Sequence, residues 1–224
     1  MQSANVSRIL VAFMGLVAAA APVLAQSRQG FLEISGGAHS VYPSERTSEF
    51  WKDVGDFSGG LGFDIGAGFQ GGVYAFGAHW SSDFPSIGGR SARSRSLGVF
   101  VQWLPGMSMR RWQPEASIGY DRVSFGNVEA RESELQAAML DPAGLGGNPG
   151  QAYETTMFGH AVRIQGGFSR RLMQRVRIHG SASVQAIRFG SVTFAGTEFD
   201  FDNAAVTWIP KLQVGLQLGT GGDR

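Results

Sequence analysis

The segment from Gly59 to Phe69 reads Gly-Gly-Leu-Gly-Phe-Asp-Ile-Gly-Ala-Gly-Phe and alternates between two kinds of residue. From Leu61 onward, every odd position is apolar, and every even position is glycine or Asp64. Because successive side chains of an extended chain point to opposite faces, a period of two predicts a β-strand with one apolar face. The segment is therefore expected to separate an apolar environment from a crowded or polar one.

The same alternation recurs along the chain and predicts eight strands, at about residues 31–39, 61–70, 73–80, 97–103, 114–121, 158–168, 176–185 and 208–218. Short links lie at 70–72, 105–110 and 170–175, and they alternate with long links at about 42–58, 81–95, 124–155 and 190–204. This rhythm is typical of a barrel with short turns at one end and long loops at the other. We therefore predict an all-β fold, an eight-stranded antiparallel up-and-down transmembrane β-barrel.

Glycine indicates which face of this barrel points inward. A soluble barrel with an apolar lumen would carry Lys, Glu or Thr on its outer, polar face. Here many positions of that face are glycine, and small residues are expected where space is short, as inside an eight-stranded barrel. The small and polar face is therefore predicted to line the lumen, and the apolar face to contact lipid. The inward glycines are Gly37, Gly62, Gly66, Gly68, Gly77, Gly98, Gly119, Gly159, Gly167 and Gly215.

Aromatic residues gather near the ends of the predicted strands, as in the two interfacial girdles of membrane barrels. Trp103 and Trp112 lie toward the short turns, and Trp80, Tyr120 and Trp208 lie toward the long loops. This distribution supports a membrane location, although aromatic residues also favour strands in general.

The N-terminal segment has the features of an export signal. Arg8 precedes an apolar run, and Val23-Leu24-Ala25 offers the small residues of a cleavage site. The run has about 16 residues and is shorter than the roughly 20 that a spanning helix needs. We predict a cleavable signal peptide at residues 1–25, a barrel domain at 26–224 and localisation in the bacterial outer membrane.

Composition excludes several classes of function. Without residues 1–25, in which Arg8 is the only charged residue, the chain has 18 basic and 18 acidic residues. This balance differs from the basic composition of nucleic-acid-binding proteins. The absence of cysteine excludes disulfides, thiolate zinc sites and a cysteine nucleophile. The four histidines, His39, His79, His160 and His179, show no close metal-ligand spacing, so we predict no metal and no cofactor.

Over residues 29–219 the chain resembles the small eight-stranded outer-membrane barrel proteins, the family of the OmpA transmembrane domain, OmpX and the opacity-type proteins. The resemblance is architectural and is carried by segments such as 59–69, not by a short motif. It implies a monomeric barrel embedded in outer-membrane lipid and lipopolysaccharide. Members of this family commonly end on an aromatic residue, whereas here Leu218 is followed by Gly-Thr-Gly-Gly-Asp-Arg.

Charged residues at lumen-facing positions form the first candidate site. Four acids and three bases nearly cancel, which predicts a paired network that plugs the barrel and disfavours a pore lined by one sign of charge. The predicted members are Glu33, Asp64, Glu115, Asp121, Arg163, Arg177 and Lys211.

The long links form the second candidate site. They hold 13 acidic and 6 basic residues, which makes them either a solvated rim or a surface for cations or a basic partner. Arg90, Arg93 and Arg95 either contact lipopolysaccharide phosphates or belong to a plain flexible loop. Asn127 is expected to cap a helix over about 128–140, which either covers the barrel mouth or docks on another protein.

An enzyme is the less favoured alternative. His179-Gly180-Ser181 resembles only the first part of the His-x-Ser-Asn pattern of outer-membrane lipid A deacylases, because Ala182 stands in the place of asparagine. A serine nucleophile needs a base and a third group that orients this base. The next carboxylate along the chain is Glu198, in a loop, so the orienting group is expected to be missing.

We therefore predict no catalytic residues. The sequence favours a non-enzymatic outer-membrane barrel that supports membrane integrity and presents loops for interaction or adhesion. A narrow channel for ions or small solutes is the alternative, and a lipid A-modifying enzyme is less favoured.

Overall fold

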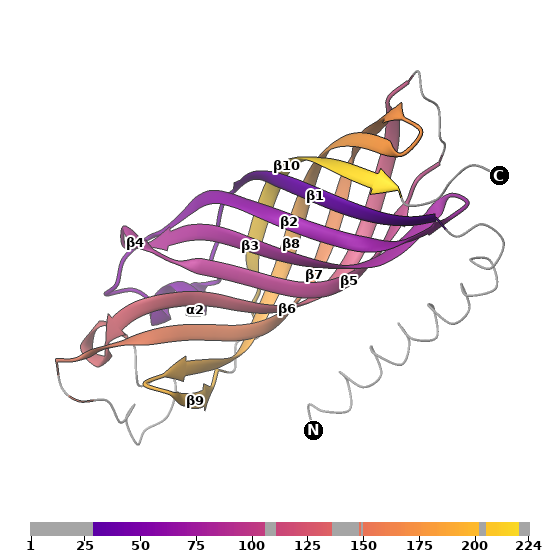
Figure 1. The fold of residues 1–224 in the computed structure, drawn as a ribbon. Coiled ribbons are helices and arrows are strands. Elements are labelled where there is room, and N and C mark those ends of the chain that lie inside the picture. The colour runs from indigo at the N-terminus through magenta and orange to yellow at the C-terminus, as the bar shows by residue number, and fades with distance from the viewer. Residues whose placement is uncertain (1–28, 106–110, 136–147, 149, 202–204, 220–224) are drawn as a thin grey trace.

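The computed structural model describes residues 29–105, 111–135, 148, 150–201 and 205–219. Eight long antiparallel strands follow one another around a closed barrel (Figure 1). The first and last of them pair along nine positions, from Phe31 opposite Gly219 to His39 opposite Lys211, so the barrel has no free edge. The predicted eight-stranded antiparallel barrel is confirmed. The strands are β1 (Gln29–His39), β2 (Phe57–Gly71), β3 (Tyr74–Ile87), β5 (Arg93–Trp103), β6 (Gln113–Arg131), β7 (Ala152–Met173), β8 (Val176–Phe194) and β10 (Thr207–Gly219).

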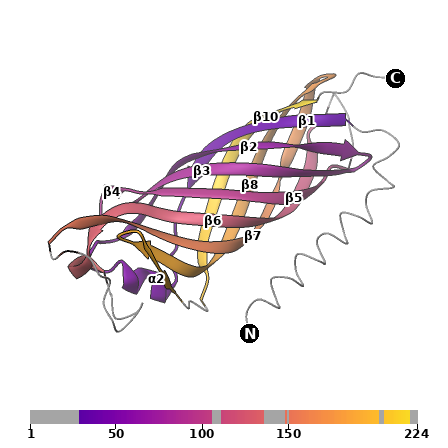
Figure 2. The same ribbon diagram turned by 60° about the horizontal axis from the view of Figure 1, so that its bottom comes forward.

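Short turns connect the strands at one end of the barrel, and the longer connections lie at the other end, here called the loop end (Figures 1 and 2). The predicted signal peptide lies outside the described residues. The predicted barrel domain contains all the strands, which begin at Gln29.

Three of the four predicted long links are shorter than expected, because the strands continue into them. Residues 81–87 and 93–95 belong to β3 and β5, residues 124–131 and 152–155 to β6 and β7, and residues 190–194 to β8. Backbone hydrogen bonds between neighbouring strands do not need a membrane around them. The apolar alternation of the outer face ends where the lipid contact ends, while the pairing of the backbones continues into water.

Short elements complete the loop end: β4 (Arg90–Ser91) pairs with β3, β9 (Thr197–Asp200) pairs with β8, and α2 (Glu45–Phe50) lies between β1 and β2. Ser44 caps α2 and accepts a hydrogen bond of 3.2 Å from the backbone N–H of Thr47. Among the described residues, no helix is long and apolar enough to cross a membrane.

The helix predicted at about 128–140 is wrong over its described part. Residues 128–131 continue β6, and only η2 (Glu132–Glu134), a single 3-10 turn, follows them. Asn127 caps no helix; it has a positive φ of 54° at a β-bulge between Gly126 and Val128, a conformation that asparagine tolerates. Pairing of β6 with β7 therefore prevails over the helical signal. Residues 136–140 lie outside the described residues.

The outer wall of the barrel is apolar and exposed, as the alternation predicted. Leu61 is 71% exposed, Leu212 68% and Ile164 63%, although these residues lie in regular strands. Leaving such side chains in water forfeits about 25 cal/mol per Å² of apolar surface, whereas a bilayer covers them. The described wall is therefore a lipid-contacting surface.

The inner wall is crowded, which explains its glycines. A Cβ atom added at most of the ten inward glycines would overlap a neighbouring strand or an inward side chain. At Gly98 it would meet the Asp121 carboxylate and the Tyr120 carbonyl, and at Gly215 the His179 imidazole. Gly66 is an exception, since the nearest atom would lie at 3.7 Å. Glycine thus makes room for the larger groups that fill the lumen.

Candidate functional site

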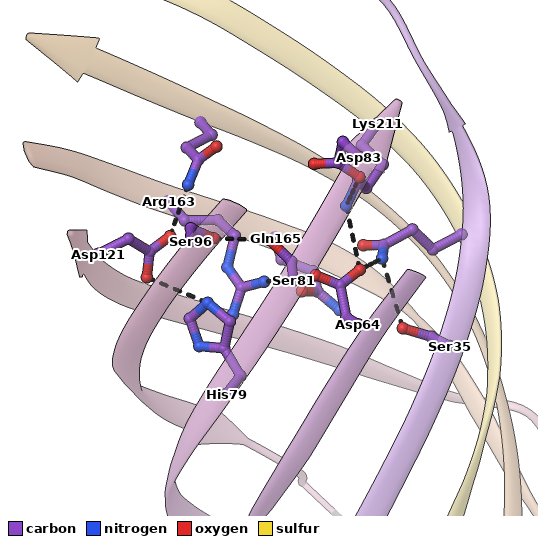
Figure 3. A network of polar contacts seen from close by, with 12 residues as sticks. Ser35, Asp64, His79, Ser81, Asp83, Ser96, Asp121, Arg163, Gln165 and Lys211 are labelled. Carbon is purple, nitrogen blue, oxygen red and sulfur yellow. Dashed lines mark hydrogen bonds and ion pairs between the residues drawn. The ribbon is translucent and has the colours of Figure 1, made fainter. Parts of the chain in front are cut away.

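The middle of the lumen holds a network of buried polar groups (Figure 3). Its centre is Lys211 on β10, whose Nζ lies 3.1 Å from Oδ2 of Asp64 on β2 and 2.7 Å from Oδ1 of Asp83 on β3. Gln213 donates a hydrogen bond to the Asp64 carboxylate and another, of 3.3 Å, to Ser35 Oγ. Arg163 on β7 reaches the other oxygen of Asp64 at 3.7 Å. These contacts tie five strands together across the lumen.

A second group of the network joins β3, β6 and β8. Nε2 of His79 lies 3.1 Å from Oδ1 of Asp121, and Gln185 donates a hydrogen bond of 2.7 Å to Oδ2 of the same carboxylate. Asp121 is fully buried. Both of its oxygens therefore have a polar partner, as a buried carboxylate requires.

A third group lies toward the short turns. His179 on β8 stands between two carboxylates, with Nδ1 3.5 Å from Glu115 Oε1 and Nε2 3.6 Å from Glu33 Oε1. Gln102 approaches the second oxygen of Glu115 at 3.4 Å. The expectation that no carboxylate could orient His179 was wrong. The missing groups come from β1 and β6, across the lumen, and not from the chain that follows His179.

The structure brings six of the seven predicted lumen charges into these groups. Arg177 points inward and is buried, but it makes no ion pair within the described part of the chain. Sequence reasoning missed Asp83, because a polar stretch was assigned to a loop that in fact continues β3. The lumen therefore contains five carboxylates, with the added one paired to Lys211.

The network leaves little space for water. Two small cavities lie within it, of about 20 Å³ beside Glu33, His79 and Arg163 and about 10 Å³ beside Asp83 and Lys211. A single water molecule needs roughly 10–15 Å³. Each cavity is thus large enough for about one water molecule and too small for a continuous aqueous path.

An apolar cluster closes the lumen at the loop end, and sequence reasoning missed it. α2 inserts Phe50 and Trp51 among inward side chains of β6, β7 and β8, and all of these side chains are fully buried. The Trp51 indole donates a hydrogen bond of 3.2 Å to the Met157 sulfur, and its ring lies edge-on to Phe50 at 5.3 Å. The largest members are Phe50, Trp51, Phe125, Met157, Phe189, Phe194 and Phe201.

The rim of the loop end is fixed by an ion pair. Arg90 donates two hydrogen bonds, of 2.6 and 3.1 Å, to the two carboxylate oxygens of Glu134, and a third to the carbonyl of Glu129. The Arg90 guanidinium, helped by the Arg131 backbone N–H, lowers the pKa of Glu134 from 4.5 to about 2. A depressed carboxyl pKa stabilises the fold above pH 4.5, and this contribution is lost as the pH falls toward 2. Both side chains are partly exposed, so the contribution is small.

The other two arginines of the predicted lipopolysaccharide contact are exposed. The Arg93 guanidinium lies 5.5 Å from the centre of the Phe84 ring, and Arg95 points outward from β5. The predicted interfacial aromatics also lie on the outer wall. Trp103 and Trp112 are near the short turns at 42% and 53% exposed, and Trp80, Tyr120 and Trp208 lie farther toward the loop end.

The described residues contain no group of three or more His, Asp or Glu side chains that could hold a metal ion. Ser181 Oγ accepts a hydrogen bond of 3.0 Å from Gln165 Nε2, and His179 is 2% exposed between Glu33 and Glu115. Both side chains therefore have polar partners within the lumen.

No family model and no curated protein sequence matches the chain. Solved structures do match it. Neisserial surface protein A has a TM-score of 0.52 at 12% identity, with 86% of this chain and 99% of that chain covered. A major outer membrane protein from Thermus thermophilus has a TM-score of 0.51 at 11% identity, with 87% of this chain and 100% of that chain covered. With the apolar outer wall, this likeness agrees with the predicted location in the bacterial outer membrane. The chain has the fold of the small outer-membrane β-barrel proteins that its sequence resembles.

Proposed function

We propose that the chain is a non-enzymatic, non-conducting barrel that supports the outer membrane and presents its closed loop end for interaction or adhesion. The observation that carries this proposal is the filling of the lumen. Toward the short turns lie the buried side chains of Phe31, Ala75, Phe100 and Leu104, followed by the polar network and then by the apolar cluster around α2. A barrel filled in this way acts through its outer surfaces.

A narrow channel is the alternative function, and the lumen disfavours it. An ion that entered would have to separate Lys211 from Asp64 and Asp83, and breaking a buried pair costs about 3 to 5 kcal/mol. It would also have to pass the buried side chains of Phe50 and Trp51, which have no polar group to replace its hydration shell except one indole N–H.

Planar bilayers test the sealed lumen. The purified barrel is expected to add no discrete conductance steps, while an open porin prepared in the same detergent serves as the positive control. Regular, reproducible steps from the wild-type chain would support the channel function instead.

The interaction half of the proposal rests on the charge of the loop end. Exposed carboxylates gather there, and Glu129 and Glu154 lie directly opposite each other on β6 and β7, although like charges in this position destabilise a sheet. A basic partner would relieve this repulsion. The exposed acids are Glu45, Glu49, Asp53, Asp56, Glu129, Glu154, Glu198 and Asp200.

Immobilised oligolysine provides a defined basic probe for this surface. The barrel in lipid nanodiscs is expected to bind it at low salt, and E45Q/E49Q/E129Q is expected to bind severalfold more weakly. Lys52→Gln, which removes an exposed positive charge beside α2, should bind more strongly. Equal binding by all three proteins would contradict a role for the acidic rim.

A further inference from the structure

A row of basic side chains crosses four neighbouring strands on the outer wall. Arg122 on β6 lies directly opposite His160 on β7, which lies directly opposite Arg188 on β8. Arg95 on β5 is opposite Ser124, two positions from Arg122 on the same face, so it continues the row diagonally. All four basic side chains are exposed. We call Arg95, Arg122, His160 and Arg188 the cationic row.

The cationic row marks the edge of the apolar wall. On each of its strands, the outward residue two positions nearer the short turns is apolar or aromatic: Leu97, Tyr120, Val162 and Ala186. Two positions farther the wall is apolar throughout, with Val99, Ile118, Ile164 and Val184 all exposed. The other half of the barrel differs, because its loop-end boundary carries Trp80 on β3 and Trp208 on β10. The positive charge is thus confined to one half of the circumference.

Arg95 and Arg122 differ from the basic residues of the chain that have acidic partners. Elsewhere in the chain Arg90 and Lys211 face carboxylates. Within the described residues, neither Arg95 nor Arg122 forms an ion pair. An anion from outside the chain can therefore pair with both of these guanidinium groups.

We propose that the cationic row binds the headgroup of an outer-leaflet lipid that carries more than one phosphate. Arginine forks match phosphate oxygens and donate charge-assisted hydrogen bonds to them. Arg122 and Arg188 are two strands apart, about 10 Å, which suits separate phosphate groups. The apolar wall next to the row accommodates the acyl chains of the same lipid. The proposal rests on the proposed outer-membrane location, which places the loop end at the outer leaflet.

One further contact orders the middle of the row. The Tyr120 and His160 rings are stacked, with centroids 5.7 Å apart and planes at 13°, which restricts the orientation of the imidazole. Of the three arginines that the sequence offered as one possible lipopolysaccharide contact, only Arg95 belongs to the row. Arg90 is held by Glu134, and Arg93 covers Phe84.

Nanodiscs of phosphatidylcholine, with and without bisphosphorylated lipid A, test the proposal. Lipid A is expected to raise the unfolding temperature of the wild-type barrel. R95Q/R122Q/R188Q should lose most of this rise and bind lipid A at least about tenfold more weakly, since it removes the charge-assisted contacts to the phosphates. In pure phosphatidylcholine, R122Q should unfold at about the temperature of the wild type, because Arg122 is exposed and forms no ion pair with a described residue.

R170Q/R175Q is the matched control, because it removes two exposed arginines near the short turns and should respond to lipid A as the wild type does. If R95Q/R122Q/R188Q does not fold, the single variant R122Q provides the same comparison. An undiminished response of the row variants would overturn the proposal, as would an equal response to dephosphorylated lipid A or to free inorganic phosphate. Bilayer conductance is unaffected by these substitutions, so failure here is distinguishable from failure of the proposed function.

Discussion

Replacing Lys211 by methionine is expected to lower the free energy of unfolding by about 3 to 5 kcal/mol, because two buried carboxylates lose their shared cation. The Lys211 ammonium lies 3.1 Å from Asp64 and 2.7 Å from Asp83, and the side chain is 8% exposed. Methionine has nearly the same length as lysine, so the loss of unfolding free energy measures the removal of the charge and not a change in packing. In the variant, Arg163 remains 3.7 Å from Asp64, and no cation remains at Asp83 among the described residues.

Thermal unfolding in detergent, followed by the difference in gel mobility between folded and heated barrel, measures this effect. Arg170→Met is the control, because Arg170 is exposed on the outer wall and should change the unfolding temperature little. Adding Asp83→Asn to Lys211→Met should restore much of the stability, since the carboxylate that has lost its cation becomes neutral while Asp64 keeps Arg163. If Lys211→Met and Arg170→Met unfold at the same temperature, the Lys211 ammonium is solvated and the network does not hold the lumen closed.

The barrel could be predicted from the sequence because alternation and link length are local signals. Leu61, Phe63 and Ile65 face outward, and Gly62, Asp64 and Gly66 face inward, as expected of the segment that starts at Gly59. The same alternation of inward and outward positions predicted six of the residues in the polar network. Each of these inferences needs only the neighbouring residues.

The apolar cluster at the loop end could not be predicted in this way. At this end the apolar residues of the alternation face inward, whereas in the membrane they face outward. Val123 and Phe125 lie on the same face of β6 as Asp121, two and four positions farther along. Inside the membrane the apolar face meets lipid, whereas beyond it the outer face meets water and the apolar side chains turn to the interior. Alternation alone does not show where the membrane ends. Phe50 and Trp51 add a contact from a loop distant in sequence.

The contacts of the candidate site also depend on register. Glu33, Glu115 and His179 come from three strands, and nothing in the spacing of these residues shows that they meet. Likewise, Arg122, His160 and Arg188 form a row only because β6, β7 and β8 pair in one particular register. A shift of one residue would turn them to the other face.

Alanine at two adjacent glycines should have opposite effects. At Gly37 a Cβ atom would overlap the Leu212 carbonyl oxygen and lie 2.8 Å from the Gln213 Cα, both on the backbone of β10. β1 and β10 close the barrel, so neither backbone can move away without losing their shared hydrogen bonds. Overpacking of this kind typically costs about 1–3 kcal/mol, and a clash with backbone falls at the upper end.

At Gly36 the added methyl group points outward, and its nearest neighbour is the Gly62 carbonyl oxygen at 3.6 Å, an ordinary contact. Alanine also has less conformational freedom to lose than glycine in a strand, so Gly36→Ala should stabilise the barrel by up to about 0.5–1 kcal/mol. The folded fraction after refolding into detergent, together with the unfolding temperature, separates the two variants. Equal effects at both positions would contradict the crowding of the inner face, because the substitutions differ only in the side of the β-sheet that receives the methyl group.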